Sequence, residues 1–196
     1  MRYPAARLVT SRLSLRPWSP DDVSVLARVL EESRAALARW TPWVLDESES
    51  AEALRGQLAR FASHFTSGVE WRYAIFLQSQ PARLLGGCGL FPRVGPGALE
   101  IGYWLATSAT GNGFATEAAA ALDDEAFRLD GVERLEIRCD PGNVASIRVP
   151  QRLGYQARSR IVHEVPGEGR PGGDVVVWER HREASRTTPE DAEAPR

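Results

Sequence analysis

The sequence has few of the residues that build disulfide frameworks or metal sites. It contains two cysteines, Cys88 and Cys139, in strand-like runs and without a CxxC spacing. Both are expected to be small buried thiols of the core, which fits a protein of the reducing cytoplasm. The three histidines, His64, His163 and His181, are scattered without the spacing of metal ligands. We therefore expect no disulfide and no bound metal.

Long apolar runs and an excess of positive charge are also absent. No run approaches the roughly 18 apolar residues that a membrane-spanning helix needs, and the first residues lack the apolar stretch of a secretory signal. All 24 basic residues are arginine, and the formal net charge is -2. No membrane or nucleic-acid partner is therefore expected, and the cytoplasm is the expected location.

The segments that are present alternate between strand-like and helix-like patterns. Cap residues such as Ser19, followed by Pro20 at the first helical position, and apolar periodicity predict helices. Short β-rich apolar runs predict strands. Short connections between consecutive strands favour antiparallel pairing. The expected helices cover residues 19–30, 50–65, 113–129 and 143–154, and the expected strands cover 12–18, 71–77, 83–91, 98–106, 134–139, 154–165 and 174–180.

The stretch from Glu100 to Cys139 reads strand, helix, strand. Such a crossover pairs its two strands in parallel through a right-handed connection. The predicted class is therefore a mixed α/β fold, with a mostly antiparallel sheet, a central parallel strand–helix–strand unit and helices on both faces. One domain over residues 1–182 and a polar tail over 183–196 are expected, because the tail has few large apolar residues.

Two glycines, Gly111 and Gly113, stand where the helix of that crossover begins. A helix N-terminus has unpaired N–H groups and a partial positive charge, so it can hold a phosphate where side chains leave access. Ala115 keeps the next position small as well. The run is not a P-loop, and Thr116 stands where a dinucleotide fingerprint needs glycine. The turn alone is thus either a phosphate cradle or simply a tight turn.

Two longer segments, EIGYWLATSATGNGFATEAAAAL and RLEIRCDPGNVASIRVPQRLGYQ, resemble the GCN5-related N-acetyltransferases (GNAT), and in particular their RimJ/RimL-like, ribosomal-protein-type branch. The opening TSRLSLRPWSPDD, the segment LARWTPWV and the close GGDVVVWER are similar to that branch too, so the resemblance covers about residues 8–180. In this family a Gln/Arg-x-x-Gly-x-Gly/Ala turn binds the pyrophosphate of acetyl-coenzyme A (acetyl-CoA) through backbone amides. Here Gly113 and Ala115 match that motif, and Thr110 replaces its basic or amide residue.

The resemblance implies a set of cofactor contacts. Backbone N–H groups around Tyr103 and Trp104 would stabilise the oxyanion of the reaction. Asn143 would contact the pantetheine arm or fix its loop, and Arg148 would reach a phosphate or be an exposed helix residue. The expected cofactor-binding residues are Tyr103, Trp104, Thr110, Gly111, Asn112, Gly113, Phe114, Ala115, Thr116, Asn143, Ser146 and Arg148.

Two residues are expected to carry the chemistry. Strand alternation places Glu100 on the same face as Trp104, and a carboxylate in this mostly apolar strand can take a proton from an ammonium, directly or through water. The alternative is a solvent-facing or salt-bridged glutamate at a strand edge. Ser146 matches the serine proposed in the branch to protonate the leaving thiolate. The alternatives are that it only caps its helix or that it bonds an amide of the cofactor. Pro150 stands where many family members have a tyrosine acid, and within a helix it would offer no N–H to the Ser146 carbonyl.

The expected activity is an N-acetyltransferase that moves acetyl from acetyl-CoA to a primary amine, in a ternary complex by direct attack. The amine belongs to a protein N-terminus or to a small molecule, with Trp43 and Glu100 at the substrate pocket. The alternative is an acyl-CoA-binding module of the same fold with weak or no catalysis. Whether the chain forms a homodimer stays open.

Overall fold

The computed structural model describes residues 3–41, 50–161 and 174–182. Trp43 and the predicted tail over 183–196 lie outside the described residues. None of the helices in the described part is long and apolar enough to cross a membrane.

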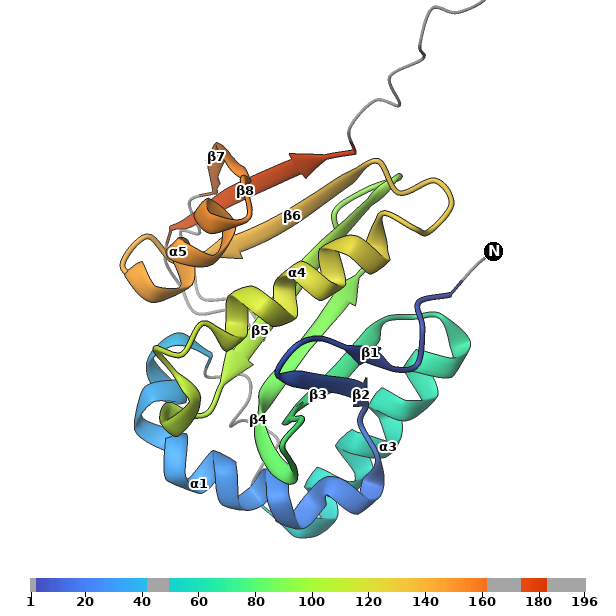
Figure 1. Cartoon of the computed structure of the whole chain (residues 1–196), viewed down its shortest axis with the longest axis vertical. Helices are drawn as coiled ribbons and strands as arrows, with labels where there is room; N and C mark the ends of the chain where they lie inside the picture. Colours follow the sequence, from blue (N-terminus) through green and yellow to red (C-terminus); the bar gives the residue numbers. More distant parts are fainter. Residues whose placement is uncertain (1–2, 42–49, 162–173, 183–196) are drawn as a thin grey trace, which may run out of the picture.

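One eight-stranded sheet organises the molecule, in the order β1-β2-β3-β4-β5-β6-β8-β7 (Figure 1). All neighbouring pairs are antiparallel except β5 and β6, so the predicted mixed sheet with one parallel unit is confirmed. The sequence did not indicate that β8 lies between β6 and β7, nor that a short strand precedes β2. The strands are β1 (Leu8–Val9), β2 (Leu13–Pro17), β3 (Trp71–Leu77), β4 (Gln80–Phe91), β5 (Ala98–Leu105), β6 (Arg134–Cys139), β7 (Gln156–Ile161) and β8 (Val175–His181).

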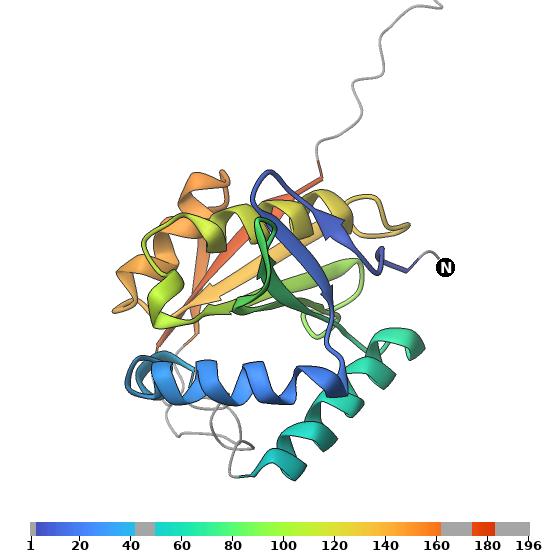
Figure 2. The same ribbon diagram turned by 60° about the horizontal axis from the view of Figure 1, so that its bottom comes forward.

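Helices cover both faces of the sheet, as predicted. Figure 2 shows α1 and α3 below the sheet and α4 and α5 above it. Within the described residues the helices are α1 (Val23–Trp40), α3 (Ala51–Ser67), α4 (Phe114–Ala126) and α5 (Val144–Arg152). Two 3-10 turns, η1 (Pro20–Asp22) and η2 (Thr107–Ala109), precede α1 and follow β5.

The predicted capping residues Ser19 and Pro20 begin the 3-10 turn η1, which runs directly into α1. The Ser19 side chain accepts a hydrogen bond from the Asp21 N–H, and Pro20 occupies the first turn. Asp22 completes a capping box on the Ser19 backbone. Its carboxylate also accepts two hydrogen bonds from Arg16 of β2, at 2.6 and 2.8 Å. Local sequence thus fixes both the start of α1 and its attachment to the sheet.

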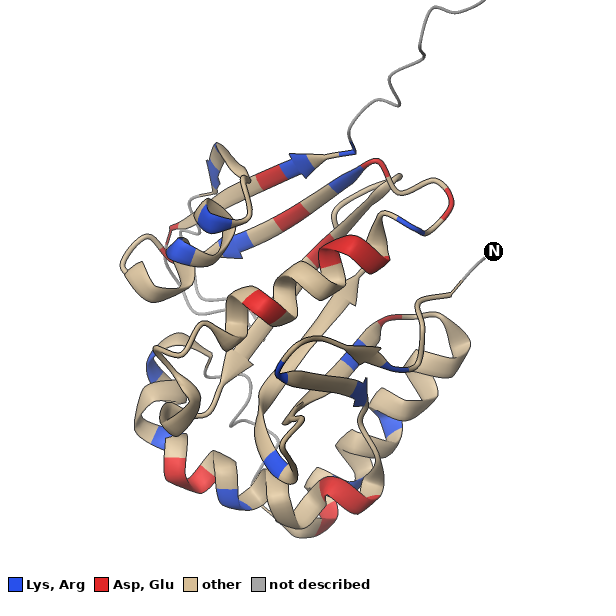
Figure 3. Cartoon of the chain, in the orientation of Figure 1, with Lys and Arg blue, Asp and Glu red and all other residues tan. Residues whose placement is uncertain are grey.

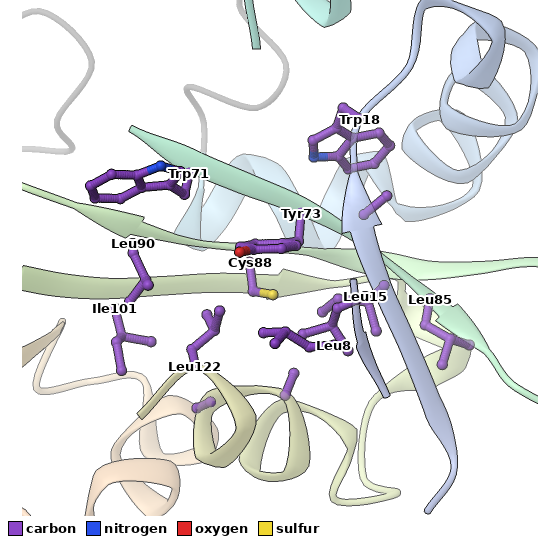
Figure 4. Close-up of a cluster of buried hydrophobic side chains, with 14 of the residues drawn as sticks. Leu8, Leu15, Trp18, Trp71, Tyr73, Leu85, Cys88, Leu90, Ile101 and Leu122 are labelled. Atoms are coloured by element: carbon purple, nitrogen blue, oxygen red, sulfur yellow. The ribbon is translucent and has the colours of Figure 1, made fainter. Parts of the chain in front are cut away.

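The core has two layers, one on each face of the sheet. Figure 4 shows Trp18 and Trp71 on one side of the strands, and Leu8, Ile101 and Leu122 on the other. Leu122 belongs to α4 and is completely buried, so α4 packs directly on the strand that leads to the glycine turn. Both cysteines are free and buried, as predicted.

The parallel strands β5 and β6 part soon after they begin. Their pairing covers only Ala98–Glu100 with Arg134–Glu136. Beyond that point β5 stays paired with β4 up to Leu105, and β6 stays paired with β8 up to Cys139. Figure 1 shows the two strands starting side by side and separating toward their carboxyl ends, with α4 crossing the region. The sheet is therefore open in its middle, between β5 and β6. The backbone groups on the edge of β5 that faces β6 have no paired strand there.

A buried ion pair joins α4 to β8. The Asp123 carboxylate, 2% exposed, lies 2.5 Å from Nη1 of Arg180, while its Oδ1 has no hydrogen-bond partner. Burial raises the pKa of Asp123 from 3.8 to about 6, against the opposing attraction of Arg180. As the pH rises, the folded protein therefore keeps the proton on Asp123 to a higher pH than the unfolded chain does.

This shift gives a pH dependence of stability. Because the pKa of Asp123 is higher in the folded state, burying its ionised carboxylate lowers the stability of the fold. This loss of stability is absent below about pH 4 and complete above about pH 6. We expect the unfolding free energy of the wild type, relative to D123N, to fall by about 3 kcal/mol as the pH rises through this window. Urea unfolding at several pH values measures this change, and D130N, at an exposed aspartate that does not contribute to the shift, is the control. A wild-type stability that rises with pH relative to D123N would contradict the shift.

Candidate active site

The glycine turn presents open backbone amides at the start of α4. Gly111 and Gly113 both have φ of 77°, in the left-handed region that favours glycine. Gly113 is the N-cap of α4, and no side chain caps the helix there. A Cβ at Gly111 would meet nothing within 4 Å. The first N–H groups of α4 are therefore accessible to an anion from outside.

The polar side chains of the turn are engaged within it. Thr110 Oγ1 donates to the Thr107 carbonyl at 2.9 Å, and Asn112 Nδ2 donates to the Thr110 carbonyl at 2.9 Å. Arg148 is exposed on α5. These hydrogen bonds stabilise the turn, and they engage the Thr110 and Asn112 side chains within it.

A basic side chain reaches the turn from a distant part of the sequence. Arg12, between β1 and β2, donates from Nη1 to the Asn112 carbonyl at 3.0 Å. Its guanidinium lies 4.6 Å above the ring of Phe114. Sequence reasoning missed this residue, although it lies in the TSRLSLRPWSPDD opening that carries part of the family resemblance.

Arg12 is held in place by Glu117 of α4. Glu117 accepts hydrogen bonds from Thr10 Oγ1, Ser11 Oγ and the Arg12 N–H and Nε–H, at 2.5 to 3.1 Å. Burial would raise the pKa of Glu117, but the hydrogen bonds from Thr10 and Arg12 outweigh it and lower that pKa. Glu117 is therefore a firmly ionised anchor for the β1–β2 connection.

Three polar side chains meet on the α4 face of the gap between β5 and β6. Ser146 Oγ, in the first turn of α5, lies 3.2 Å from the Tyr103 hydroxyl and 3.3 Å from Cys139 Sγ. The Asn143 side chain caps α5 by accepting from the Ser146 N–H at 3.1 Å. Burial raises the pKa of Tyr103 and of Cys139 above their ordinary values, so both stay protonated at neutral pH.

Pro150 explains why Tyr103 bonds to the helix backbone. Pro150 lies inside α5 and has no N–H, so the Ser146 carbonyl lacks its usual helical partner. The Tyr103 hydroxyl donates to this carbonyl at 3.1 Å. The proline and the tyrosine therefore fix the position of Ser146 together, from two different elements.

Glu100 lies on the other face, among arginines. Its side chain is 8% exposed, and its two oxygens accept from Arg93 Nε and Nη2 at 2.9 and 2.6 Å. Arg138 of β6 lies 3.7 Å from one oxygen. The neighbouring carboxylate, Glu136, is paired with Arg134 and Arg138. Figure 3 shows these acidic and basic bands alternating along β6. A carboxylate has about four lone-pair sites, so Glu100 can accept a further N–H or water beside Arg93.

The end of α1 approaches the loop between β6 and α5. The Trp40 ring lies 3.7 Å from where a Cβ on Gly142 would be. The end of α1 therefore lies next to Gly142 of this loop, directly before α5, whose first turn carries Ser146. Trp43, expected at the substrate pocket, lies outside the described residues.

Comparison with known proteins identifies the family. Residues 12–156, well over half of the chain, match the model of the acetyltransferase (GNAT) domain. The chain belongs to the GNAT acetyltransferases. It is an acetyl-CoA-dependent N-acetyltransferase, and the RimJ/RimL-like resemblance of its sequence is confirmed.

Individual relatives agree with this assignment. The chain is 27% identical over 180 residues to "Probable N-acetyltransferase YjcK" of Bacillus subtilis (strain 168), covering 90% of this chain and 94% of that protein. It is 42% identical over 161 residues to the uncharacterised YkkB of the same organism, covering 79% and 88%. The fold is similar to that of the ribosomal L7/L12 α-N-protein acetyltransferase RimL in complex with coenzyme A, with a TM-score of 0.78, 24% identity, and 91% and 98% coverage.

Proposed function

We propose that this GNAT enzyme transfers acetyl from acetyl-CoA to the primary amine of a protein N-terminus, by direct attack in a ternary complex. The observation that carries the proposal is the gap between β5 and β6, with the open turn of α4 and the Ser146 hydroxyl on one face and Glu100 on the other. The α-N-protein activity in the name of RimL supports this class of acceptor. A small-molecule amine is the other candidate acceptor.

In this proposal the coenzyme's pyrophosphate binds the amides between Gly111 and Thr116. The pantetheine arm then runs between the separated strands toward Ser146. Tyr103 and Trp104 lie on the part of β5 that has no pairing with β6, but β5 stays paired with β4 there. Consecutive N–H groups of a strand point to opposite edges, so only one of these two N–H groups faces the gap. That N–H group is the proposed donor to the oxyanion.

The proposed reaction moves one acetyl group and one proton. The neutral amine nitrogen attacks the thioester carbonyl and forms a C–N bond, and the C–S bond of the tetrahedral intermediate then breaks. Glu100, directly or through a water, accepts the proton that the amine loses. The Ser146 hydroxyl donates a proton to the departing thiolate, and solvent returns it to Ser146. Holding both substrates together lowers the barrier by several kcal/mol.

An assay of thiol release tests the function. The protein is incubated with acetyl-CoA and either a set of short peptides with free N-termini, the same peptides with blocked N-termini, or small amines. We expect thiol release and a matching acetylated product with at least one free N-terminus, and none with its blocked form. Turnover confined to small amines would overturn the acceptor class, and tight coenzyme binding without any turnover would favour the binding module.

The Ser146 hydroxyl is expected to have a modest effect on rate. A thiol with a pKa near the ordinary 8.5 leaves readily as thiolate, so its acid supplies less than a typical acid catalyst. We expect S146A to lower kcat about tenfold at pH 7 and to recover toward wild type above about pH 8.5, where the thiolate needs no proton. Steady-state rates against pH measure this, and a pH-independent deficit would rule out the acid role.

A further inference from the structure

The turn motif of this chain lacks its usual basic residue, because Thr110 occupies that position. Arg12 occupies the same region in space. Its Nη1 donates to the Asn112 carbonyl at 3.0 Å, and its Nη2 lies 3.6 Å from where a Cβ on Gly113 would be. The Arg12 side chain is 46% exposed, so it borders both the turn and solvent.

Glu117 makes a compensating charge necessary. It is the fourth residue of α4, and its carboxylate therefore lies beside the N–H groups proposed to hold a pyrophosphate. A carboxylate and a pyrophosphate carry charges of the same sign, so they repel each other at close range. Arg12 contacts Glu117 Oε2 through Nε and Nη2, at 2.7 and 2.6 Å. The pair places the guanidinium next to Asn112 and Gly113.

We propose that Arg12 is a positioning residue for the coenzyme's pyrophosphate. Its hydrogen bond to the Asn112 carbonyl fixes the turn with its backbone N–H groups facing solvent. Its positive charge offsets the charge of Glu117, which would otherwise repel the anion. This inference rests on the proposed placement of the coenzyme, and it assigns to the β1–β2 connection the part that a basic residue plays within the family's turn.

The test compares compounds that share the pantetheine arm but differ in their phosphates. For R12Q we expect the Kd of CoA, measured by calorimetry, to rise about tenfold. The Kd of 3′-dephospho-CoA, which keeps the pyrophosphate, should rise equally. The KM for acetyl-CoA should rise by the same factor with kcat within twofold, while kcat/KM for S-acetylpantetheine, which has no pyrophosphate, stays within twofold of wild type.

The matched control is R34Q, which removes an arginine from an exposed pair with Glu31 on α1. It should leave every Kd within twofold. The double variant R12Q/E117Q should bind CoA more tightly than R12Q, because the uncompensated carboxylate is gone. If R12Q does not fold, R12K replaces it, with an expected threefold loss for CoA and none for S-acetylpantetheine.

Three results would overturn the proposal. One is an equal loss with S-acetylpantetheine and acetyl-CoA, which would indicate a general structural role for Arg12. Another is a loss confined to CoA and absent with 3′-dephospho-CoA, which would place Arg12 at the 3′-phosphate. The third is a double variant no tighter than R12Q. The binding measurements need no acceptor, so they remain decisive even if the wild type turns over no amine.

Discussion

Replacing Gly113 by valine is expected to weaken the binding of acetyl-CoA about 100-fold. Gly113 has φ of 77°, which costs a residue with a Cβ about 1 to 2 kcal/mol and a β-branched one more. The new side chain would also cover the amides at the start of α4, and each lost hydrogen bond to a charged group weakens binding by about 1.5 to 3 kcal/mol. Calorimetry with CoA measures the Kd without any acceptor.

The chain offers a matched control for backbone strain. Gly131, after α4, has φ of 79°, and a Cβ there would meet nothing within 4 Å. We therefore expect G131V to lose a similar amount of stability but to keep its affinity for CoA within twofold. If G131V and G113V lose the same affinity, the loss comes from destabilisation, and the turn of α4 is not the phosphate site.

Replacing Glu100 by glutamine is expected to lower kcat about 100-fold, within the range usual for the loss of a general base. The glutamine side chain would keep the size of the original and lose the charge that accepts the amine's proton. Because Glu100 lies on the sheet face opposite Ser146, the Kd of acetyl-CoA should stay within twofold. Initial rates of thiol release at saturating acetyl-CoA, together with calorimetry, separate the two effects.

The natural control for this change is E136Q. Glu136 is the partner of Glu100 in the parallel register, is as deeply buried, and is likewise bound by arginines. It should lose at most a few-fold in rate, because its carboxylate lies on β6 and takes no part in the proposed proton transfer. Wild-type turnover in E100Q would remove Glu100 as the base. An equal loss in both variants would instead indicate damage to the shared ion-pair network.

Local sequence was sufficient to predict the features that depend on neighbouring residues. Ser19 and Pro20 indicated the start of the helical segment that η1 and α1 form, and the glycines at 111 and 113 indicated the turn before α4. The pattern from Glu100 to Cys139 indicated the parallel strand–helix–strand unit, because a crossover of this kind allows one common arrangement. These elements frame the proposed coenzyme site.

The contacts that complete the site were not predictable from spacing alone. Arg12 meets Asn112 and Glu117 across about 100 residues of sequence, and only the packing of the β1–β2 connection on α4 brings them together. The bond from Tyr103 to the Ser146 carbonyl likewise needs both β5 and α5 in place. For Pro150, the sequence did indicate that this carbonyl would lack its helical N–H donor.

The central claim is that the coenzyme lies across the turn of α4 and reaches between β5 and β6. A crystal structure of the protein with bound CoA tests it most directly. The account predicts the pyrophosphate on the backbone amides between Gly111 and Thr116, and the sulfur within hydrogen-bond reach of Ser146 Oγ. Coenzyme bound with its phosphates away from the turn, or with its sulfur far from Ser146, would contradict the account.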